Sequence, residues 1–192
     1  IDMLTLVKSY IKEKYNKPGN VYLGLVHRLD RPVGGVMIFA RTSKAASRLS
    51  NQVREKIFKK EYLTIVDGKL KSDKGTLENY LLKDTKTNTS KVVKNSIPNS
   101  KLAKLDYKVL KYDEKEDISL LEINLHTGRH HQIRVQLSNL GHSIYGDNKY
   151  GNRGKGKQIA LWAYKLTIIH PTTKEQMTFT SMPKPIGIWK IL

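Results

Sequence analysis

Hydrophobic residues recur with a helical period in three stretches of the chain. Leu4, Val7 and Ile11 follow one another at this spacing, and the pattern stops before the turn-forming residues 16–19, so a helix is expected over residues 4 to about 15. Two further helices are expected where the same period begins at a capping residue or ends at a glycine: one after Thr42 or Ser43 along Ala46, Leu49, Val53 and Ile57, and one from near Arg129 along Ile133, Leu137 and Leu140 to Gly141.

Shorter apolar or alternating stretches between these helices predict β-strands at residues 21–26, 36–40, 62–66, 107–112, 118–125, 159–169 and 176–180. Residues 72–100 are polar and rich in lysine around a weak strand near 77–82, and we expect a surface excursion there. Because strands outnumber helices and short turns join most of them, the expected fold class is α+β, with a mixed, largely antiparallel sheet flanked by helices. No repeat or low-complexity linker interrupts residues 1–192, which are therefore expected to form one domain.

Charge narrows the class of partner. The 192 residues include 35 Lys and Arg against 17 Asp and Glu, which gives a formal net charge of +18. Such an excess favours a polyanionic partner, either nucleic acid or an anionic membrane surface. No stretch approaches the ~20 apolar residues of a membrane span, so RNA or DNA is favoured. The alternative is that the lysines reflect only the source organism and solubility.

Cysteine is absent, which removes disulfides, thiol catalysis and cysteine-based zinc sites. No secretory signal is visible, and the composition suits a reducing cytoplasm, where we expect the protein to act. A monomer is expected for a chain of this charge.

Asp30 is a lone carboxylate in the run His27-Arg28-Leu29-Asp30-Arg31, and the Pro and Gly residues that follow place it on a loop. Nearby cations would hold it ionised, and a loop between two strands leaves it accessible. On charge alone, a structural aspartate in a turn is the better interpretation.

A second segment runs from Leu125 to Gln136 and combines Gly128 with several basic residues. The first helical turn is expected to offer free N–H groups to a phosphate beside Arg129 and His131. Arg134 lies one helical turn beyond His130, on a face away from the apolar stripe. Neighbouring histidines without an acidic cluster do not predict zinc. The alternative is a solvated basic helix.

Tyr62 opens a strand directly after Lys59-Lys60, where an aromatic ring beside cations could stack on an unpaired base. An ordinary aromatic residue packed into the sheet is the alternative, and for Tyr62 alone it is the better one.

Together, the three segments resemble the RluA family of pseudouridine synthases. His27-Arg28-Leu29-Asp30 with Gly35 resembles its signature loop, Lys60-Glu61-Tyr62 its basic-x-Tyr strand, and Thr127 to Arg134 its Thr-Gly-Arg-x-His-Gln-hydrophobic-Arg motif, continued by Gly141-His142 and Gly146-Asp147. The match is in the family's order and runs from near Leu4 to about Pro183. The resemblance implies the pseudouridine synthase catalytic fold and isomerisation of uridine in ribosomal or transfer RNA, with neither cofactor nor metal.

The resemblance also implies roles for single residues. Asp30 would be the catalytic carboxylate, Arg134 its partner, and Tyr62 the group that packs on the uracil and is a candidate acceptor for the C5 proton. RNA contacts are expected from a set of basic residues and histidines: His27, Arg28, Arg31, Lys60, Arg129 and His131.

Two departures from the family pattern affect the detail of the site. Pro32-Val33-Gly34-Gly35 stands where the family has Thr-Ser-Gly, and Gln136 stands where it has His. The family's opening strand and its S4-type RNA-binding domain do not match any part of this chain, which starts at Ile1, so we expect an N-terminal part outside this sequence. The competing hypotheses are a non-catalytic RNA-binding module, for instance one associated with the ribosome, and an RNA hydrolase that uses the histidines.

Overall fold

The computed structural model describes residues 1–154 and 157–192, and their contacts divide the chain into two compact units. One unit comprises Ile1–Arg28, Met37–Phe58 and Thr167–Thr178, and the other comprises Leu29–Val36, Lys59–Leu166 and Phe179–Leu192. The helices are α1 (Met3–Lys14), α2 (Ser43–Arg54), α3 (Gln132–Asn139) and the 3₁₀ turn η1 (Gly187–Ile191). The strands are β1 (Gly24–Leu25), β2 (Gly34–Gly35), β3 (Phe39–Ala40), β4 (Lys59–Asp67), β5 (Lys74–Asp84), β6 (Thr89–Val93), β7 (Lys101–Asp113), β8 (Ile118–Leu125), β9 (Leu161–Ile169) and β10 (Gln176–Thr180).

In the first unit, local sequence signals set the helices. The Thr42 side chain caps α2 by accepting a hydrogen bond from the Ala45 N–H at 3.1 Å, as the sequence predicts. Gln52 fastens α2 to the chain at Ile169: its amide group bonds the carbonyl of Ile169 at 2.6 Å and the N–H of Ile169 at 2.9 Å. The strands expected at 21–26 and 36–40 shorten to the two-residue antiparallel pair β1–β3.

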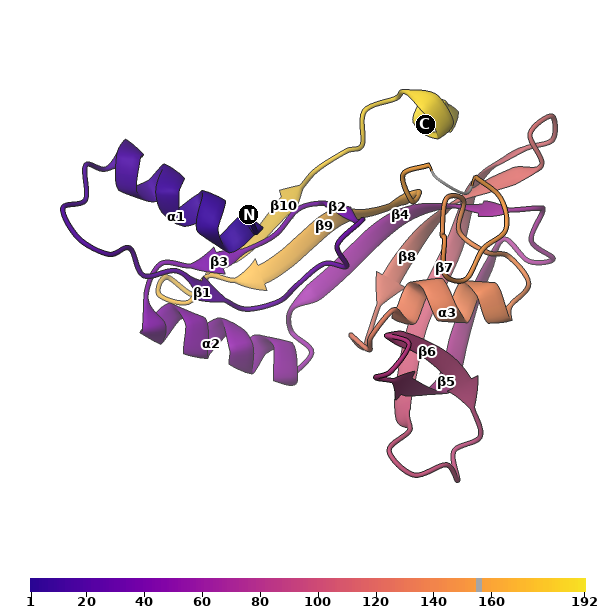
Figure 1. Cartoon of the computed structure of the whole chain (residues 1–192), viewed down its shortest axis with the longest axis horizontal. Coiled ribbons are helices and arrows are strands. Elements are labelled where there is room, and N and C mark those ends of the chain that lie inside the picture. Colours follow the sequence, from indigo (N-terminus) through magenta and orange to yellow (C-terminus); the bar gives the residue numbers. More distant parts are fainter. Residues whose placement is uncertain (155–156) are drawn as a thin grey trace. The chain divides into compact units, whose positions relative to one another are not determined.

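In the second unit, antiparallel pairs join β4 to β8, β8 to β7, β7 to β5 and β5 to β6 (Figure 1). The complete sheet has the order β10-β9-β4-β8-β7-β5-β6, and β2 pairs with β9 in parallel. A core of aliphatic residues lies on this sheet, with Ile65, Leu105, Leu121 and Ile123 fully buried. The α+β class with a mixed, largely antiparallel sheet is confirmed.

The expectation for residues 72–100 is wrong in one respect. Instead of a surface excursion around a weak strand, β5 and β6 form a regular hairpin, and β5 also pairs with β7 along Lys74 to Leu81. Strand β5 alternates between inward residues such as Leu81 and exposed ones such as Glu78. The many lysines hid this alternation, because they make the segment as a whole polar even though one face of the strand is covered.

Helix α3 begins at Gln132, three residues later than the sequence indicates, because His131 adopts a left-handed conformation with φ 53°. Its residues from Gln132 to Leu137 are all buried, so the alternative of a solvated basic helix does not hold for this part of the helix. Leu140, expected to point inward, is exposed. The helix is thus enclosed on its polar side as well as its apolar side.

A network of buried amide groups makes this enclosure possible. The Gln132 carbonyl oxygen accepts hydrogen bonds from Thr127 Oγ1 at 2.7 Å and the Arg129 N–H at 3.0 Å, and its amino group donates to the Lys104 carbonyl at 3.1 Å. The Gln132 amino group also donates to Gln136 Oε1 at 3.0 Å. Gln136 Nε2 in turn donates to Asn79 Oδ1 at 2.8 Å. The amide chain therefore fixes α3 against β5 and β7, since every buried polar group needs a partner.

Replacing Gln132 with leucine should remove these bonds while keeping an apolar body of similar size. The Arg129 N–H and Gln136 Oε1 would lose their partner, at about 1–3 kcal/mol for each group left unpaired. We expect Gln132→Leu to lower the free energy of unfolding in urea by at least about 2 kcal/mol. Gln176→Leu on exposed β10 is the matched control and should change it by less than about 0.5 kcal/mol. Equal stabilities would contradict this account.

Candidate active site

Asp30 lies at the start of a turn whose ends are fixed in the second unit. The Val33 N–H donates to the Asp30 carbonyl at 2.9 Å and closes the turn around Arg31 and Pro32. Leu29 and Val33, on either side of the turn, pack against the hydrophobic core. The loop position expected for Asp30 is confirmed, and the loop is anchored at both ends.

Gly34 and Gly35 explain how the turn reaches the sheet. They pair with Trp162 and Ala163 of β9, and the Val36 N–H donates to the Ala163 carbonyl at 2.9 Å. A Cβ on Gly34 would collide with the Trp162 ring, and one on Gly35, where φ is +122°, would collide with the Ala163 backbone. Gly35 matches the family's signature loop, whereas Gly34 belongs to the departure from Thr-Ser-Gly, and that departure has a structural use because only glycine permits this close approach to Trp162.

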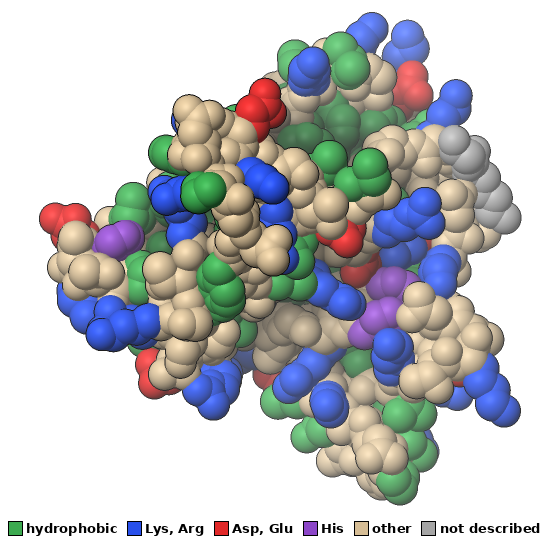
Figure 2. Space-filling view, turned by 60° about the vertical axis from the view of Figure 1, so that its left-hand side comes forward, with side chains coloured by type: hydrophobic (Ala, Val, Ile, Leu, Met, Phe, Trp, Pro, Cys, Tyr) green, Lys and Arg blue, Asp and Glu red, His purple; other side chains and the backbone are tan. Residues whose placement is uncertain are grey.

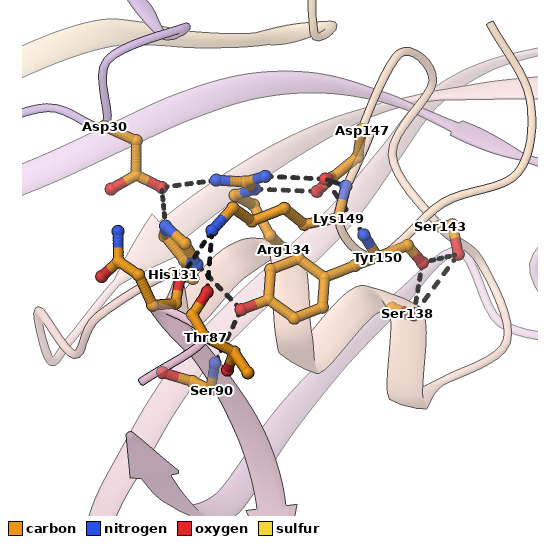
Figure 3. Close-up of polar contacts among 11 residues, drawn as sticks. Asp30, Thr87, Ser90, His131, Arg134, Ser138, Ser143, Asp147, Lys149 and Tyr150 are labelled. Carbon is orange, nitrogen blue, oxygen red and sulfur yellow. Dashed lines mark hydrogen bonds and ion pairs between the residues drawn. The ribbon is translucent and has the colours of Figure 1, made fainter. Parts of the chain in front are cut away.

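Arg134 and Asp147 form the most enclosed ion pair of the site (Figure 3). The guanidinium binds the carboxylate with two bonds, Nε to Oδ2 at 2.8 Å and Nη2 to Oδ1 at 2.7 Å. Asp147 also accepts hydrogen bonds from the N–H groups of Lys149 at 2.9 Å and Tyr150 at 3.2 Å. Burial acts to raise the pKa of Asp147, but the bonds from Arg134 and the backbone outweigh it, so this pKa lies below its ordinary value.

The third nitrogen of the same guanidinium reaches Asp30. Arg134 Nη1 donates to Asp30 Oδ2 at 3.2 Å, and His131 Nε2 faces the same oxygen at 3.7 Å (Figure 3). The Arg134 side chain is 6% exposed and that of Asp30 is 30% exposed, so the arginine holds the carboxylate from the protein side while the carboxylate remains open to solvent. The pairing of Asp30 with Arg134 that the family resemblance implied is therefore present.

Two details of the sequence-based picture need correction. Arg134 does not share a helical face with His130, because His130 precedes the helix. Its bidentate partner is Asp147, to which the sequence pattern assigned no role. A signal was available: Ile133 and Val135 lie on opposite sides of Arg134 around the helix. Where both of these faces are buried, the arginine between them is buried as well and requires a carboxylate.

Tyr62 lies in β4 opposite Ile123 of β8 and is buried in the core. Burial raises the pKa of the Tyr62 phenol, and the negative charge of Asp30 raises it further. The phenol is therefore protonated at neutral pH, which disfavours a role as the base in the free protein. A packing role beside Asp30 agrees better with this environment.

The basic residues expected to bind RNA fall into two groups. In the second unit, Arg31 is exposed on the turn after Asp30, and exposed Arg129 donates from Nε to the Leu102 carbonyl at 2.9 Å. Lys60 lies beside Gly128, where an added Cβ would be 3.1 Å from its Nζ, and burial lowers the pKa of Lys60. These three cations remain candidates for phosphate contacts.

His27 and Arg28 belong to the first unit, where Arg28 is exposed. His27 Nε2 accepts a hydrogen bond from the Ile38 N–H at 3.1 Å, and its ring lies 5.2 Å from that of Phe58. This setting gives His27 a structural task in the loop.

His131 also differs from the expectation drawn from its basic neighbours. It is buried rather than presented to solvent, and burial lowers its pKa to about 4 even though Asp30 acts to raise it. A neutral, buried imidazole does not offer a positive charge to a phosphate, so its position beside Asp30 calls for another role.

Lysine and arginine side chains are spread over the face shown in Figure 2, with few acidic side chains among them. Within residues 1–154 and 157–192, no three histidine, cysteine, aspartate or glutamate side chains lie close enough together to bind a metal ion. No helix in the same part of the chain has the length and apolar character needed to cross a membrane. Chemically, the site offers an oriented carboxylate, a fixed guanidinium, a neutral imidazole and a protonated phenol.

Both the sequence and the structure of the chain are similar to those of known proteins. The sequence profile of the family described as RNA pseudouridylate synthase matches residues 4–139. An uncharacterized RNA pseudouridine synthase of Bacillus subtilis is 40% identical over 151 residues, which are 78% of this chain and 49% of that protein. Ribosomal large subunit pseudouridine synthase C of Haemophilus ducreyi is 32% identical over 173 residues, covering 86% of this chain and 53% of that protein.

The chain thus spans about half the length of these curated relatives. Among solved structures, human RNA pseudouridylate synthase domain containing 1 matches with a TM-score of 0.75 and 25% identity, over 92% of this chain and 74% of that one. The signature segments, the fold and the profile match agree: the chain belongs to the RluA-type family of RNA pseudouridine synthases.

Proposed function

We propose that this protein isomerises specific uridines of structured RNA to pseudouridine, with Asp30 as the catalytic carboxylate. The observation that carries the proposal is the arrangement of Asp30, a partly exposed carboxylate whose inner oxygen is held by an arginine that Asp147 fixes in turn. Family membership supplies the type of reaction, and this arrangement supplies a group suited to it.

The reaction rearranges atoms without adding or removing any. The N1–C1′ bond of the uridine breaks, C5 bonds to C1′, the C5 proton leaves and N1 gains a proton, so no oxidant or co-substrate is needed. Asp30 would either attack C1′ and form a transient ester or take a proton from C2′ to give a glycal. Both routes need a carboxylate that is oriented before the substrate arrives, which is the task assigned to Arg134.

Tyr62 would form a wall of the pocket and pack on the uracil. A group that keeps the detached base in place lets the ring turn without escaping, and an apolar wall suits that task. The raised pKa of Tyr62 makes packing the better assignment than proton removal from C5.

The target uridine would have to leave its helical stack, at a cost of a few kcal/mol, before it reached Asp30. Phosphate contacts from Arg28, Arg31, Lys60 and Arg129 would help to offset this cost, and the net charge of +18 supports a polyanionic substrate. The Haemophilus relative is named for the large ribosomal subunit, and ribosomal or transfer RNA is the substrate class we assign to this chain.

Asp30→Asn keeps the size of the side chain and removes its charge, so it should abolish pseudouridine formation while changing RNA affinity little. Chemical mapping of pseudouridine in ribosomal and transfer RNA after incubation with the full-length protein measures the first effect, and filter binding measures the second. Asp73→Asn, at an exposed position, is the matched control and should retain activity. If the wild-type protein makes no pseudouridine on any of these RNAs, a non-catalytic RNA-binding module is the better description; strand cleavage would indicate a hydrolase.

Asp147→Asn tests whether Arg134 must be held on both sides. Removing one partner of a buried ion pair should lower the free energy of unfolding by about 3–5 kcal/mol. Because the pKa of Asp147 is lowered in the folded state, its contribution is present above the unfolded value near 4 and is lost as the pH falls through the folded one. Urea titrations at pH 7 and pH 3 should therefore show a smaller difference between wild type and variant at pH 3. A difference independent of pH would contradict this assignment.

RNA affinity should weaken as salt rises, because bound phosphates release counterions. Replacing Arg31 with glutamine removes one candidate contact and should reduce the slope of log affinity against log salt by about 0.7–0.9. Lys174→Gln, at an exposed position in the first unit, removes the same charge at a position to which no RNA contact is assigned. Equal slopes for the two variants would remove Arg31 from the RNA interface.

A further inference from the structure

Three connected groups have no part in the reaction as described above: His131, which faces Asp30, Tyr150, which contacts His131, and Ser90, which contacts Tyr150 (Figure 3). His131 immediately precedes α3, Tyr150 lies in the loop after that helix, and Ser90 lies in β6. His131 has φ 53° and ψ 26°, a left-handed conformation that is uncommon for residues other than glycine. A buried residue held in this conformation invites the question of what its ring is placed to do.

The hydrogen bonds indicate which ring nitrogen of His131 carries the proton. A backbone N–H can only donate, so the Tyr150 hydroxyl oxygen accepts from the Ser90 N–H at 2.7 Å. The Tyr150 hydroxyl keeps its own proton, and His131 Nδ1, 2.8 Å away, is the acceptor placed to receive it. In this arrangement Nδ1 is unprotonated, and a neutral ring carries its proton on Nε2.

The other side of the ring selects the same tautomer. His131 Nε2 faces Asp30 Oδ2 at 3.7 Å. An unprotonated Nε2 would turn its lone pair toward a carboxylate oxygen and repel it, whereas an Nε2–H attracts it. The hydrogen bonds from Ser90 through Tyr150 and the carboxylate of Asp30 therefore favour the same proton position from opposite sides of the ring.

The surroundings keep the ring neutral. Asp30 favours the charged form of His131, but Arg134, His130 and Lys149 oppose it, and burial opposes it most. His130 is stacked on His131 with ring centroids 3.8 Å apart, and the Tyr150 ring meets it edge-on at 5.5 Å. The resulting pKa of about 4 leaves His131 uncharged at neutral pH.

We propose that His131 is a positioning residue for Asp30, donating from Nε2–H to the carboxylate while the Tyr150 hydroxyl holds the ring in that tautomer. The inference rests on the proposed function, in which Asp30 is the reacting group. The 3.7 Å separation has to shorten by about 0.5–1 Å to become a hydrogen bond, a change that substrate binding can bring about.

A neutral donor suits this position better than a second cation. Arg134 and His131 both face Oδ2 of Asp30. Neither of these two donors contacts Oδ1, so that oxygen is left for the substrate. A second positive charge at this distance would stabilise the carboxylate further and reduce its reactivity toward the sugar. An imidazole without charge fixes the plane of the carboxylate and avoids that loss.

Two substitutions of His131 distinguish the role of Nε2 from that of Nδ1. The amide nitrogen of glutamine can take the place of Nε2, whereas that of asparagine reaches only the place of Nδ1. We expect His131→Gln to keep kcat within about threefold of wild type and His131→Asn to lower it by about 10- to 100-fold, with KM for the RNA little changed. Thermal unfolding of both variants shows whether either has lost its fold.

Tyr150→Phe removes the hydroxyl and leaves the imidazole in place. It should lower kcat by about tenfold or more and populate both tautomers, which nitrogen-15 NMR of the imidazole detects directly. Wild-type His131 should be in the Nε2–H form at pH 7 and titrate near pH 4. Tyr112→Phe, which removes an exposed hydroxyl bonded to Asp117, is the control and should alter neither measurement.

An Nδ1–H or charged His131 in the active wild-type protein at pH 7 would overturn the inference and leave the proposed function intact. Equal losses of kcat in folded His131→Gln and His131→Asn would overturn it as well. A wild-type protein that makes no pseudouridine at all would end the proposed function itself, and the positioning role with it.

Discussion

Arg134 carries a full positive charge in a place that water scarcely reaches, and the surrounding structure supplies the compensation. Asp147 provides two bonds and Asp30 a third, while the backbone after Asp147 satisfies the remaining acceptors of that carboxylate. Because an unpaired buried charge costs several kcal/mol, α3, the loop that carries Asp147 and the turn that carries Asp30 must assume their positions together. The orientation of the carboxylate at the centre of the site is therefore a consequence of a requirement imposed in the interior.

The parts of the fold that the sequence predicts are those set by neighbouring residues. Thr42 caps α2, Tyr62 begins a run of buried residues in β4, and a charged turn joins β7 to β8; each signal lies within a few positions. Local patterns do not predict the β5–β6 hairpin, because its support comes from pairing with β7, whose residues lie 20 to 34 positions away along the chain. The start of α3 was misplaced because the left-handed His131 depends on contacts with Tyr150 and Asp30 that no local pattern contains.

The residues of the site also differ in whether the sequence predicts their roles. Asp30 and Arg134 were identified through the resemblance of three segments to one family, whereas charge alone favoured a turn residue for Asp30. No local pattern predicts the role of Asp147, because it follows from the burial of Arg134, which is a property of the packed helix and not of either residue. His131 was grouped with the cations by residue type, although burial leaves its ring neutral. Residue type predicts which chemistry is available, and tertiary burial decides which charge state is used.

Gly34 and Gly35 make the backbone of the Asp30 turn continuous with β9 through main-chain pairing that tolerates no side chain. In a library of variants of this loop, Gly34 and Gly35 cannot be replaced by residues with a side chain. Arg31 and Pro32 are exposed and can be replaced by every residue type that the turn accepts. Changes in substrate choice during evolution would have to follow the same division. The loop can exchange the side chains it presents to RNA, but it cannot lengthen toward the sheet or move away from it without displacing the carboxylate.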